Sequence, residues 1–493
     1  MADNKEFKEG LKATSLFGGV QIFNIIIGII RSKLVAILLG PEGMGLNGIL
    51  SSTLQLINGF SGFGLGTSAI KNVSEAHSTG NPDKLSHTLT IFRKLVWLTG
   101  LLGFGVCLFF SPLLSFVSFG NYDYVLAFAA VSITVLFMQL TEGRKVLLQG
   151  TRHFKYMAKA SILGSVIGLV TTIPLYYVLG MNGVVPAIII ASITSLILMW
   201  FFSNKVPYSK KEMTLKTALF EGRDMIKMGF FLSLQGLLSL LMVYLIRVFI
   251  NRYGSLADVG LFVAGFYIVD TYVGMVFSAM STEYYPRLAS HSNGSTEEFN
   301  ETINQQIKIS LLLVSPLICA FLVFGNLMVY ILYSEKFLPI SIMICFAMLG
   351  TYFKAPSWCV AYSFLAKGDG VGVFCNEVFA SAFSTFLKIL FFYLWGLTGI
   401  GIAYLLGYFV YYIQVAIMCR YRYKYLFDNS ILKFYIPQLI LGTICFILFI
   451  FGNPYVQYPI GILVTCVSAY MSYRLLNQYI DVDTVIMNLV RRK

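Results

Sequence analysis

The sequence predicts an all-α polytopic membrane protein of about fourteen transmembrane helices, arranged as two pseudo-symmetric six-helix bundles followed by two extra C-terminal helices. Two observations lead to this fold class. Hydrophobic residues make up 57% of the 493 residues and charged residues only 12%, about half the charged share of an ordinary soluble domain. Apolar stretches of membrane length recur from one end of the chain to the other, and part of their pattern repeats in the second half.

The apolar stretches are expected to be helices rather than strands. About 20 apolar residues cross the hydrocarbon core of a bilayer as a helix, and lipid admits only helices or closed barrels as spanning structures. The alternation with a period of two that a membrane barrel requires is missing. The expected spans are 13–39, 46–68, 94–117, 124–148, 158–179, 183–202, 228–250, 259–281, 307–332, 340–365, 371–395, 398–419, 432–451 and 456–475.

The charges of the connections predict the orientation in the membrane. Four alternate connections, 40–45, 118–124, 179–183 and 395–399, contain no Lys or Arg. Most basic residues lie in the other set, which the positive-inside rule assigns to the cytoplasm. Both termini are therefore expected in the cytoplasm, and the net charge of +13 is an orientation signal that predicts no nucleic-acid partner. The C-terminal tail adds Arg474, Arg491, Arg492 and Lys493 to this set.

The longest connections, residues 69–93, 203–227 and 282–306, belong to the cytoplasmic set. The third is polar and is expected to contain a short amphipathic helix on the membrane surface. None is long enough to hold a soluble catalytic domain.

An internal repeat predicts how the spans are grouped. The segment LGMNGVVPA at 179–187 resembles WGLTGIGIA at 395–403. Arg31 and Arg247 are separated by the same number of positions as these two segments. An even number of helices in each repeat makes the two halves parallel, as in transporters built from two bundles around a cleft. The expected domains are an N-terminal lobe at 1–202, a cytoplasmic linker at 203–227, a C-terminal lobe at 228–419 and two further helices at 432–475.

Polar side chains form stripes along single faces of the first two spans. Gln21, Asn24 and Arg31 follow helical spacing on span 13–39, and Gln55 and Asn58 do so on span 46–68. A charge inside the bilayer is costly and normally faces the interior of a bundle. These five residues are therefore predicted to line a polar cavity and to bind substrate.

The second half contributes further basic residues within spans. Lys354 lies deep in span 340–365 and Lys388 lies on span 371–395, and both are predicted to bind substrate. Arg247 lies near the outer end of span 228–250, where facing the cavity and snorkelling to the interface are both open. The interior is therefore net cationic, which suits an anionic substrate such as a diphosphate.

Two acidic residues are candidates for ion coupling. Asp270 lies near the middle of span 259–281, too deep for a short side chain to reach water at either end. It could pair with a basic residue, exchange a proton or bind a cation. Glu377 is the second candidate, although it lies near a cytoplasmic end, where a solvated role is equally open.

No cofactor or metal is predicted. The eight cysteines lie in or beside apolar segments without a CxxC pair, and the four histidines lack the spacing of metal ligands. Walker, HExxH and GxSxG motifs are also absent, which argues against nucleotide-driven transport and hydrolysis.

Three segments give the chain a family resemblance. They are RSKLVAILLGPEGMGLNGIL at 31–50, FSGFGLGTSAIKNVSE at 60–75 and LLQGTRHFKYMAKASILGSVIG at 147–168. With the GxxGxxxA turns and the count of twelve plus two helices, the chain resembles the polysaccharide transporter branch of the multidrug/oligosaccharidyl-lipid/polysaccharide (MOP) flippase superfamily, in particular the Wzx-type O-antigen translocases. The resemblance covers essentially the whole chain.

The resemblance implies a flippase rather than an enzyme. It implies a bacterial inner-membrane protein that moves an undecaprenyl-diphosphate-linked O-antigen (lipopolysaccharide) repeat unit to the outer face by alternating access, with antiport of H⁺ or Na⁺ in some members. Basic residues line the vestibule in this family, and Arg31, Lys354 and Lys388 match in position and character. A polysaccharide polymerase and a chain-length regulator are possible partners beside membrane lipids.

Two alternatives remain open at this point. A MATE-like drug/cation antiporter would have a more acidic cavity. A membrane polysaccharide polymerase or acyltransferase would carry a large external loop with catalytic residues, whereas the external connections here are short and nearly uncharged.

Overall fold

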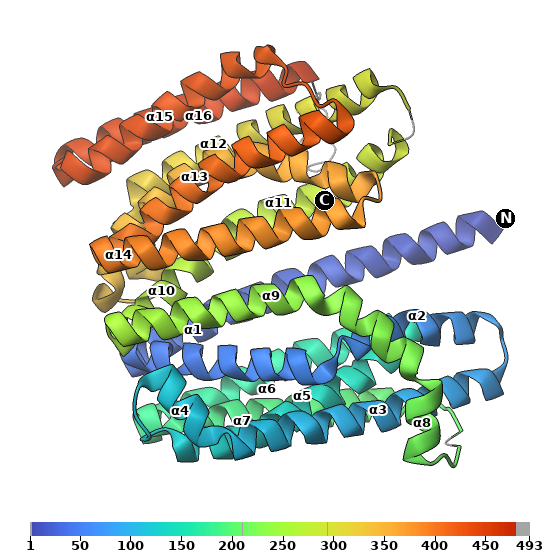
Figure 1. The fold of residues 1–493 in the computed structure, drawn as a ribbon. Coiled ribbons are helices and arrows are strands. Elements are labelled where there is room, and N and C mark those ends of the chain that lie inside the picture. Colours follow the sequence, from blue (N-terminus) through green and yellow to red (C-terminus); the bar gives the residue numbers. More distant parts are fainter. Residues whose placement is uncertain (1, 210, 293, 480–493) are drawn as a thin grey trace, which may run out of the picture. The chain divides into compact units, whose positions relative to one another are not determined.

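A computed structural model describes residues 2–209, 211–292 and 294–479, and the described part is helical with no strand (Figure 1). The basic tail Arg491, Arg492 and Lys493 lies outside the described residues. The α-helices are α1 (Ala2–Gly62), α2 (Leu65–Ser78), α3 (Pro82–Phe109), α4 (Ser111–Phe119), α5 (Val125–Gly150), α6 (Phe154–Leu179), α7 (Val184–Ser203), α8 (Leu215–Glu221), α9 (Arg223–Tyr253), α10 (Leu256–Ile268), α11 (Gly274–Ser290), α12 (Thr296–Leu332), α13 (Ser341–Ala366), α14 (Gly370–Tyr423), α15 (Leu432–Phe451) and α16 (Pro454–Tyr479). Short turns of helix join some of them: η1 (Gly180–Gly183), η2 (Val269–Val273), η3 (Glu335–Ile340) and η4 (Asn429–Ile431).

Eleven helical segments of the described chain are long and apolar enough to cross a membrane. Three of them, of 44, 50 and 54 residues, would each measure about 65 Å or more as straight helices, twice the thickness of a hydrocarbon core. Each of the three is interrupted near its middle, at Gly40, at Gly180–Gly183 and at Trp395–Gly396. Counting each as two crossings gives fourteen, so the predicted fold class is confirmed.

The two interruptions that the repeat aligned have the same backbone conformation. Gly180 has φ 55° and ψ −131°, and Gly396 has φ 60° and ψ −142°, a region open to glycine almost alone. Three residues later, a Cβ on Gly183 would lie 2.5 Å from the Leu175 carbonyl oxygen, and one on Gly399 would lie 1.9 Å from that of Phe391. The repeat seen in the sequence therefore encodes the same turn twice.

The chain divides into two compact units, residues 1–260 (unit 1) and 261–493 (unit 2). In unit 1, α9 packs against α1 and α2. Glycines permit this approach, since a Cβ on Gly64 would lie 2.1 Å from the carbonyl oxygen of Gly229. Contacts thus keep α9 with the first unit, whereas the lobe boundaries inferred from the repeat stay a prediction.

In unit 2, α12 and α13 form the centre and pack against α14, α15 and α16. The largest buried side chains of this unit include Tyr352 and Tyr284, whose hydroxyl groups donate hydrogen bonds to the backbone oxygens of Gln438 (2.9 Å) and Cys359 (2.8 Å). Buried hydroxyl groups that find a partner avoid the cost of burying an unsatisfied polar group.

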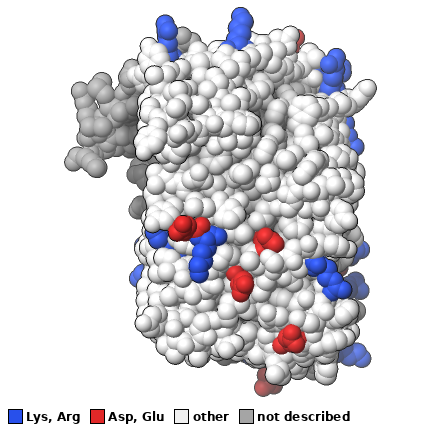
Figure 2. All heavy atoms as spheres, turned by 90° about the vertical axis from the view of Figure 1, so that its left-hand side faces the viewer, with Lys and Arg blue, Asp and Glu red and all other residues white. Residues whose placement is uncertain are grey.

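Large apolar side chains cover much of the outer surface of both units. Phe109 and Leu126 in unit 1 and Phe451 in unit 2 are each more than 80% exposed. Such exposure is costly in water and favourable in lipid. Figure 2 shows the face at the left-hand side of Figure 1, where charged side chains are few on a largely uncharged surface.

The short amphipathic helix expected within 282–306 is not an element of its own but the start of a longer helix. Helix α11 continues to Ser290, and α12 begins at Thr296. Ser295 caps α12, since its hydroxyl oxygen accepts a hydrogen bond from the Glu298 amide at 3.2 Å. The sequence Ser-Thr-Glu-Glu has the form of a capping box, so this helix start was visible in the sequence.

Candidate functional site

Asp270 lies on the single π-helical turn of the described chain, η2, between α10 and α11. A π turn is a rare departure from the α-helix that often marks a functional site. The Asp270 side chain is exposed in the structure although its helix has the length and composition of a membrane span. Within the described residues it forms no ion pair of 4.0 Å or less.

Lys354 on α13 lies among aromatic side chains of unit 2. Its Nζ donates a hydrogen bond to the Tyr404 hydroxyl at 3.1 Å. The same nitrogen lies 5.4 Å from the ring centroid of Tyr408 and 5.9 Å from that of Phe277. Ring faces attract a cation without neutralising it. The rings and the Tyr404 hydroxyl therefore stabilise the Lys354 ammonium group.

Lys388 on α14 faces the same group of residues. Its Nζ lies 5.1 Å from the ring centroid of Phe266, and that ring packs edge-on against Tyr404 with centroids 5.7 Å apart. Both ammonium groups are close enough to Asp270, and to each other, to interact electrostatically. We call Asp270, Lys354, Lys388, Tyr404 and Tyr408 the lysine cluster. Two cations with a single carboxylate leave it net positive.

Glu377 lies on α14 about three turns before Lys388 and is half-buried. Its electrostatic neighbour is Tyr411, whose hydroxyl also accepts a hydrogen bond from Asn376 Nδ2 at 2.8 Å. The Tyr411 ring packs edge-on against that of Tyr408, with centroids 6.2 Å apart, so Tyr411 links Glu377 to the lysine cluster.

The polar stripe of α1 packs against α6. Asn24 Nδ2 donates to the Ser161 hydroxyl at 3.0 Å, and Asn24 Oδ1 accepts from the Ser165 hydroxyl at 2.7 Å. Arg31 Nη2 donates to the Ser165 carbonyl oxygen at 3.3 Å. A Cβ on Gly168 would lie 2.8 Å from that same nitrogen, so glycine makes room for the guanidinium group.

The remaining predicted residues of unit 1 do not share the hydrogen bonds that join Asn24 and Arg31 to α6. Arg247 Nη1 donates to the Gly48 carbonyl oxygen at 2.6 Å. The side chains of Gln21 and Gln55 are exposed and that of Asn58 is half-buried. The backbone oxygen of Asn58 accepts a hydrogen bond from Gln139 Nε2 at 2.9 Å.

Tyr404 and Tyr408 were not among the residues predicted from the sequence. They lie four residues apart on one face of α14, directly after Ala403 of the repeated turn segment. That helical spacing beside a deep lysine was the available signal, but tyrosines at such spacing are equally common in ordinary cores. Only the packing of α13 against α14 shows that they surround Lys354.

Comparisons with known proteins match the chain to one family. The profile of the family described as "Polysaccharide biosynthesis protein" matches residues 34–342, more than half of the chain. A Shigella flexneri protein named "Putative O-antigen transporter" is 22% identical over 326 residues, which cover 64% of this chain and 75% of that protein.

Solved structures share the fold. The lipid II flippase MurJ in its inward closed conformation aligns with a TM-score of 0.72 at 15% identity, covering 94% of this chain and 99% of that one. An inward-facing MATE-family multidrug transporter of the MOP superfamily aligns with a TM-score of 0.62 at 16% identity, covering 84% and 96%. At these identities the likeness establishes the fold alone.

Proposed function

The chain belongs to the family of polysaccharide biosynthesis proteins, and on this premise we propose that it moves an undecaprenyl-diphosphate-linked oligosaccharide from the cytoplasmic to the outer face of the bacterial inner membrane. Family and fold make it a multi-pass transporter of the flippase type rather than an enzyme. The proposed substrate is an O-antigen repeat unit or a related surface polysaccharide unit, as the name of the Shigella relative suggests.

The observation that carries the proposal is the lysine cluster. Two ammonium groups lie at membrane depth, and Asp270 is the carboxylate of the described chain that interacts with them electrostatically. A polar diphosphate crossing the bilayer needs fixed positive charge, because leaving a charge unpaired in a medium of low dielectric constant is expensive. In this proposal Lys354 and Lys388 bind the diphosphate, and the Tyr404 and Tyr408 hydroxyl groups offer further hydrogen bonds.

The other predicted residues have supporting roles in the proposal. Arg31, whose Nη2 donates to the Ser165 carbonyl oxygen, is retained as a substrate-binding residue. Arg247, Gln21, Asn24, Gln55 and Asn58 are retained as candidate substrate contacts. The cytoplasmic location of both termini follows from the positive-inside rule, and a polymerase and a chain-length regulator are the proposed partners.

Asp270 is the proposed coupling residue, and Glu377 is the weaker candidate. Asp270 lies on a π turn and is close enough to both lysines to interact with them electrostatically, so a bound phosphate, which competes for the same two ammonium groups, changes the charge that surrounds the carboxylate. Binding of the ion and of the substrate would thus be linked through the same two lysines.

The experiment measures the lipid-linked oligosaccharide on each face of the membrane in cells that lack the chromosomal gene and carry a plasmid copy. K354Q and K388Q are expected to lower export about tenfold or more, since a charge-assisted hydrogen bond contributes about 1.5–3 kcal/mol. K433Q removes one charge from the same unit at an exposed position and should export normally. Normal export from both cluster variants at wild-type protein levels would refute the proposal.

Further variants test whether positive charge is what matters, whether Asp270 couples transport to an ion gradient, and whether the protein transports drugs instead. K354R and K388R retain positive charge and should restore part of the export. D270N should make export insensitive to collapse of the H⁺ and Na⁺ gradients. A MATE-like drug/cation antiporter, which the shared fold also permits, would instead show drug resistance that K354Q leaves intact.

A further inference from the structure

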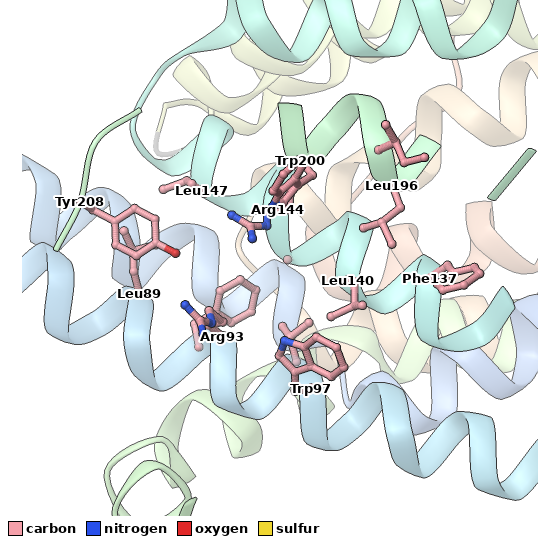
Figure 3. Close-up of a pocket in the computed structure, with 14 residues that line it drawn as sticks. Leu89, Arg93, Trp97, Phe137, Leu140, Arg144, Leu147, Leu196, Trp200 and Tyr208 are labelled. Carbon is pink, nitrogen blue, oxygen red and sulfur yellow. The ribbon is translucent and has the colours of Figure 1, made fainter. Parts of the chain in front are cut away.

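A pocket of about 430 Å³ opens in unit 1 between α3, α5, α7 and the segment that follows α7 (Figure 3). It lies entirely outside the lysine cluster, and the proposed transport function does not use it. Most of its lining is apolar, with Trp97, Phe137 and Trp200 as the largest members. The charged members are Arg93 and Arg144, and the lining contains no Asp or Glu.

The two arginines form an uncompensated positive site. Figure 3 shows both guanidinium groups projecting into the same space, with the Tyr208 ring beside them. They are close enough to interact electrostatically, with the same sign. Arg144 Nη1 donates to Asn204 Oδ1 at 3.4 Å, but neither arginine forms an ion pair of 4.0 Å or less with a carboxylate of the described chain. Two neighbouring like charges are stabilised by an anion placed between them.

The polarity of the pocket changes along its length. Arg144 lies six residues before the end of α5 and Phe137 lies a further seven residues back, about 10 Å deeper along the helix axis. The arginines lie toward the Lys- and Arg-rich ends of the helices with Leu89 and Leu147 beside them, and most of the apolar lining continues toward the middle of the spans. A lipid has the same polarity, with a charged phosphate at the interface and hydrocarbon below it.

The apolar part of the pocket is open to the surroundings of the protein. Trp97 is 45% exposed, Trp200 is 50% exposed and Ile197 is 55% exposed. Tryptophan is enriched at the level of lipid headgroups. A hydrocarbon chain can therefore enter from the side and lie against these residues without any rearrangement of the helices.

We propose that this pocket binds one anionic phospholipid of the bilayer. Arg93 and Arg144 hold the phosphate, the planar guanidinium groups being suited to bidentate recognition of its oxygens, and the Tyr208 hydroxyl donates a further hydrogen bond. One acyl chain lies along Trp97, Phe137 and Trp200. The charge complementarity and the direction of the polarity both select a lipid over a soluble anion, which would leave the apolar part of the pocket unfilled.

The test is native mass spectrometry of the purified full-length protein, titrated with dioleoyl phosphatidylglycerol or with zwitterionic dioleoyl phosphatidylcholine. Wild-type protein is expected to bind one phosphatidylglycerol molecule at least tenfold more tightly than phosphatidylcholine. R93Q/R144Q should abolish this preference. K155Q/K159Q, which removes two exposed positive charges from α6 of the same unit, should retain it.

Three outcomes would overturn the proposal. An equal loss in the K155Q/K159Q variant would mean that net charge alone attracts the lipid. Displacement of phosphatidylglycerol by inorganic phosphate at equal concentration would mean that the hydrocarbon chain contributes nothing. Displacement by undecaprenyl phosphate at much lower concentration would assign the pocket to the isoprenoid carrier. If R93Q/R144Q fails to fold, W97A/W200A, which keeps both arginines, should weaken phosphatidylglycerol binding and leave phosphate binding unchanged.

Discussion

The two units carry basic side chains at membrane depth in different ways. In unit 1, Arg31 and Arg247 each donate to a backbone carbonyl oxygen, of Ser165 and of Gly48. In unit 2, Lys354 has one hydroxyl partner, and both Lys354 and Lys388 lie beside aromatic rings with Asp270 nearby. The arginines are thus partly used in holding helices together, whereas the lysines keep most of their capacity to bind an anion.

A buried charge alone therefore does not define a substrate site. A carbonyl oxygen at hydrogen-bond distance occupies a donor and fixes the side chain. A ring face stabilises the cation yet leaves its hydrogens available. The four basic residues predicted within spans therefore separate into two classes once their hydrogen-bond and aromatic partners are known.

The largest expected difference between the two classes concerns Arg31. R31Q is expected to lower export less than K354Q does, because Ser165 already holds one of the guanidinium nitrogens, and to lower the thermal stability of the detergent-solubilised protein more. R31K, which lacks the planar fork, should behave like R31Q in stability and like wild type in export. Export from R31Q as low as that from K354Q would place Arg31 in the same class as the lysines.

A medium effect tests whether the two units share a turn. G180A in unit 1 and G396A in unit 2 should each lower the free energy of unfolding by about 1–3 kcal/mol, since alanine is strained at this backbone conformation. A Cβ added at either glycine would meet no neighbouring atom within 4 Å, so the backbone alone sets the cost. Thermal unfolding of both variants should give matching losses, and G164A, in a helical stretch of α6 where only the end of the Leu198 side chain comes near, at 3.8 Å, is the control. Clearly unequal losses would argue against an equivalent turn.

The smallest expected effect is the loss of stability when one ion pair in each unit is removed. Lys308 Nζ lies 2.8 Å from Asp428 Oδ2, with Lys308 only 14% exposed, whereas Lys145 and Glu142 in unit 1 are 3.2 Å apart and each 43% exposed. D428N should therefore cost more stability than E142Q, with both below about 1 kcal/mol because solvent screens such pairs. The unfolding temperature of each variant relative to wild type, in detergent at neutral pH, measures the two losses. A larger loss in E142Q than in D428N would contradict the prediction.

The Asp428 pair should also respond to pH. Hydrogen bonds from Lys308 and Ser430 lower the pKa of Asp428 from 3.8 to about 2. A carboxylate whose pKa is lower in the folded than in the unfolded protein stabilises the fold at pH values above its unfolded-state pKa. This stabilisation is lost as pH falls through its folded-state pKa. The stability difference between wild type and D428N is thus expected to be constant above about pH 5, to shrink as pH falls through the two pKa values, and to vanish below about pH 2.

Much of the fold was predictable because lipid imposes strict rules on sequence. Long apolar stretches predicted the membrane-spanning helices that the structure contains, and the two aligned glycine segments share one backbone conformation at Gly180 and Gly396. The orientation inferred from the charge-free connections stays a prediction. The start of α12 was not predicted, although the capping box at Ser295 indicates it. That error came from treating a polar stretch as a connection, since a helix can extend beyond the membrane.

The candidate site was predictable only in its residue types. Helical spacing marked Lys354, Lys388 and Asp270 as costly in lipid, but not which neighbours each would meet. The hydrogen bond between Lys354 and Tyr404 connects residues 50 positions apart in the sequence. The π turn at Asp270 follows no recognised sequence rule.

By itself the sequence determined that the chain crosses the membrane many times, where it turns and which spans contain charge, because the cost of moving polar groups into lipid acts on each segment separately. The tertiary structure decided which charges have carbonyl partners, which lie against rings and which two arginines share a pocket. Those properties depend on distances of a few ångströms between helices far apart in the chain, and no periodicity within one helix can specify them.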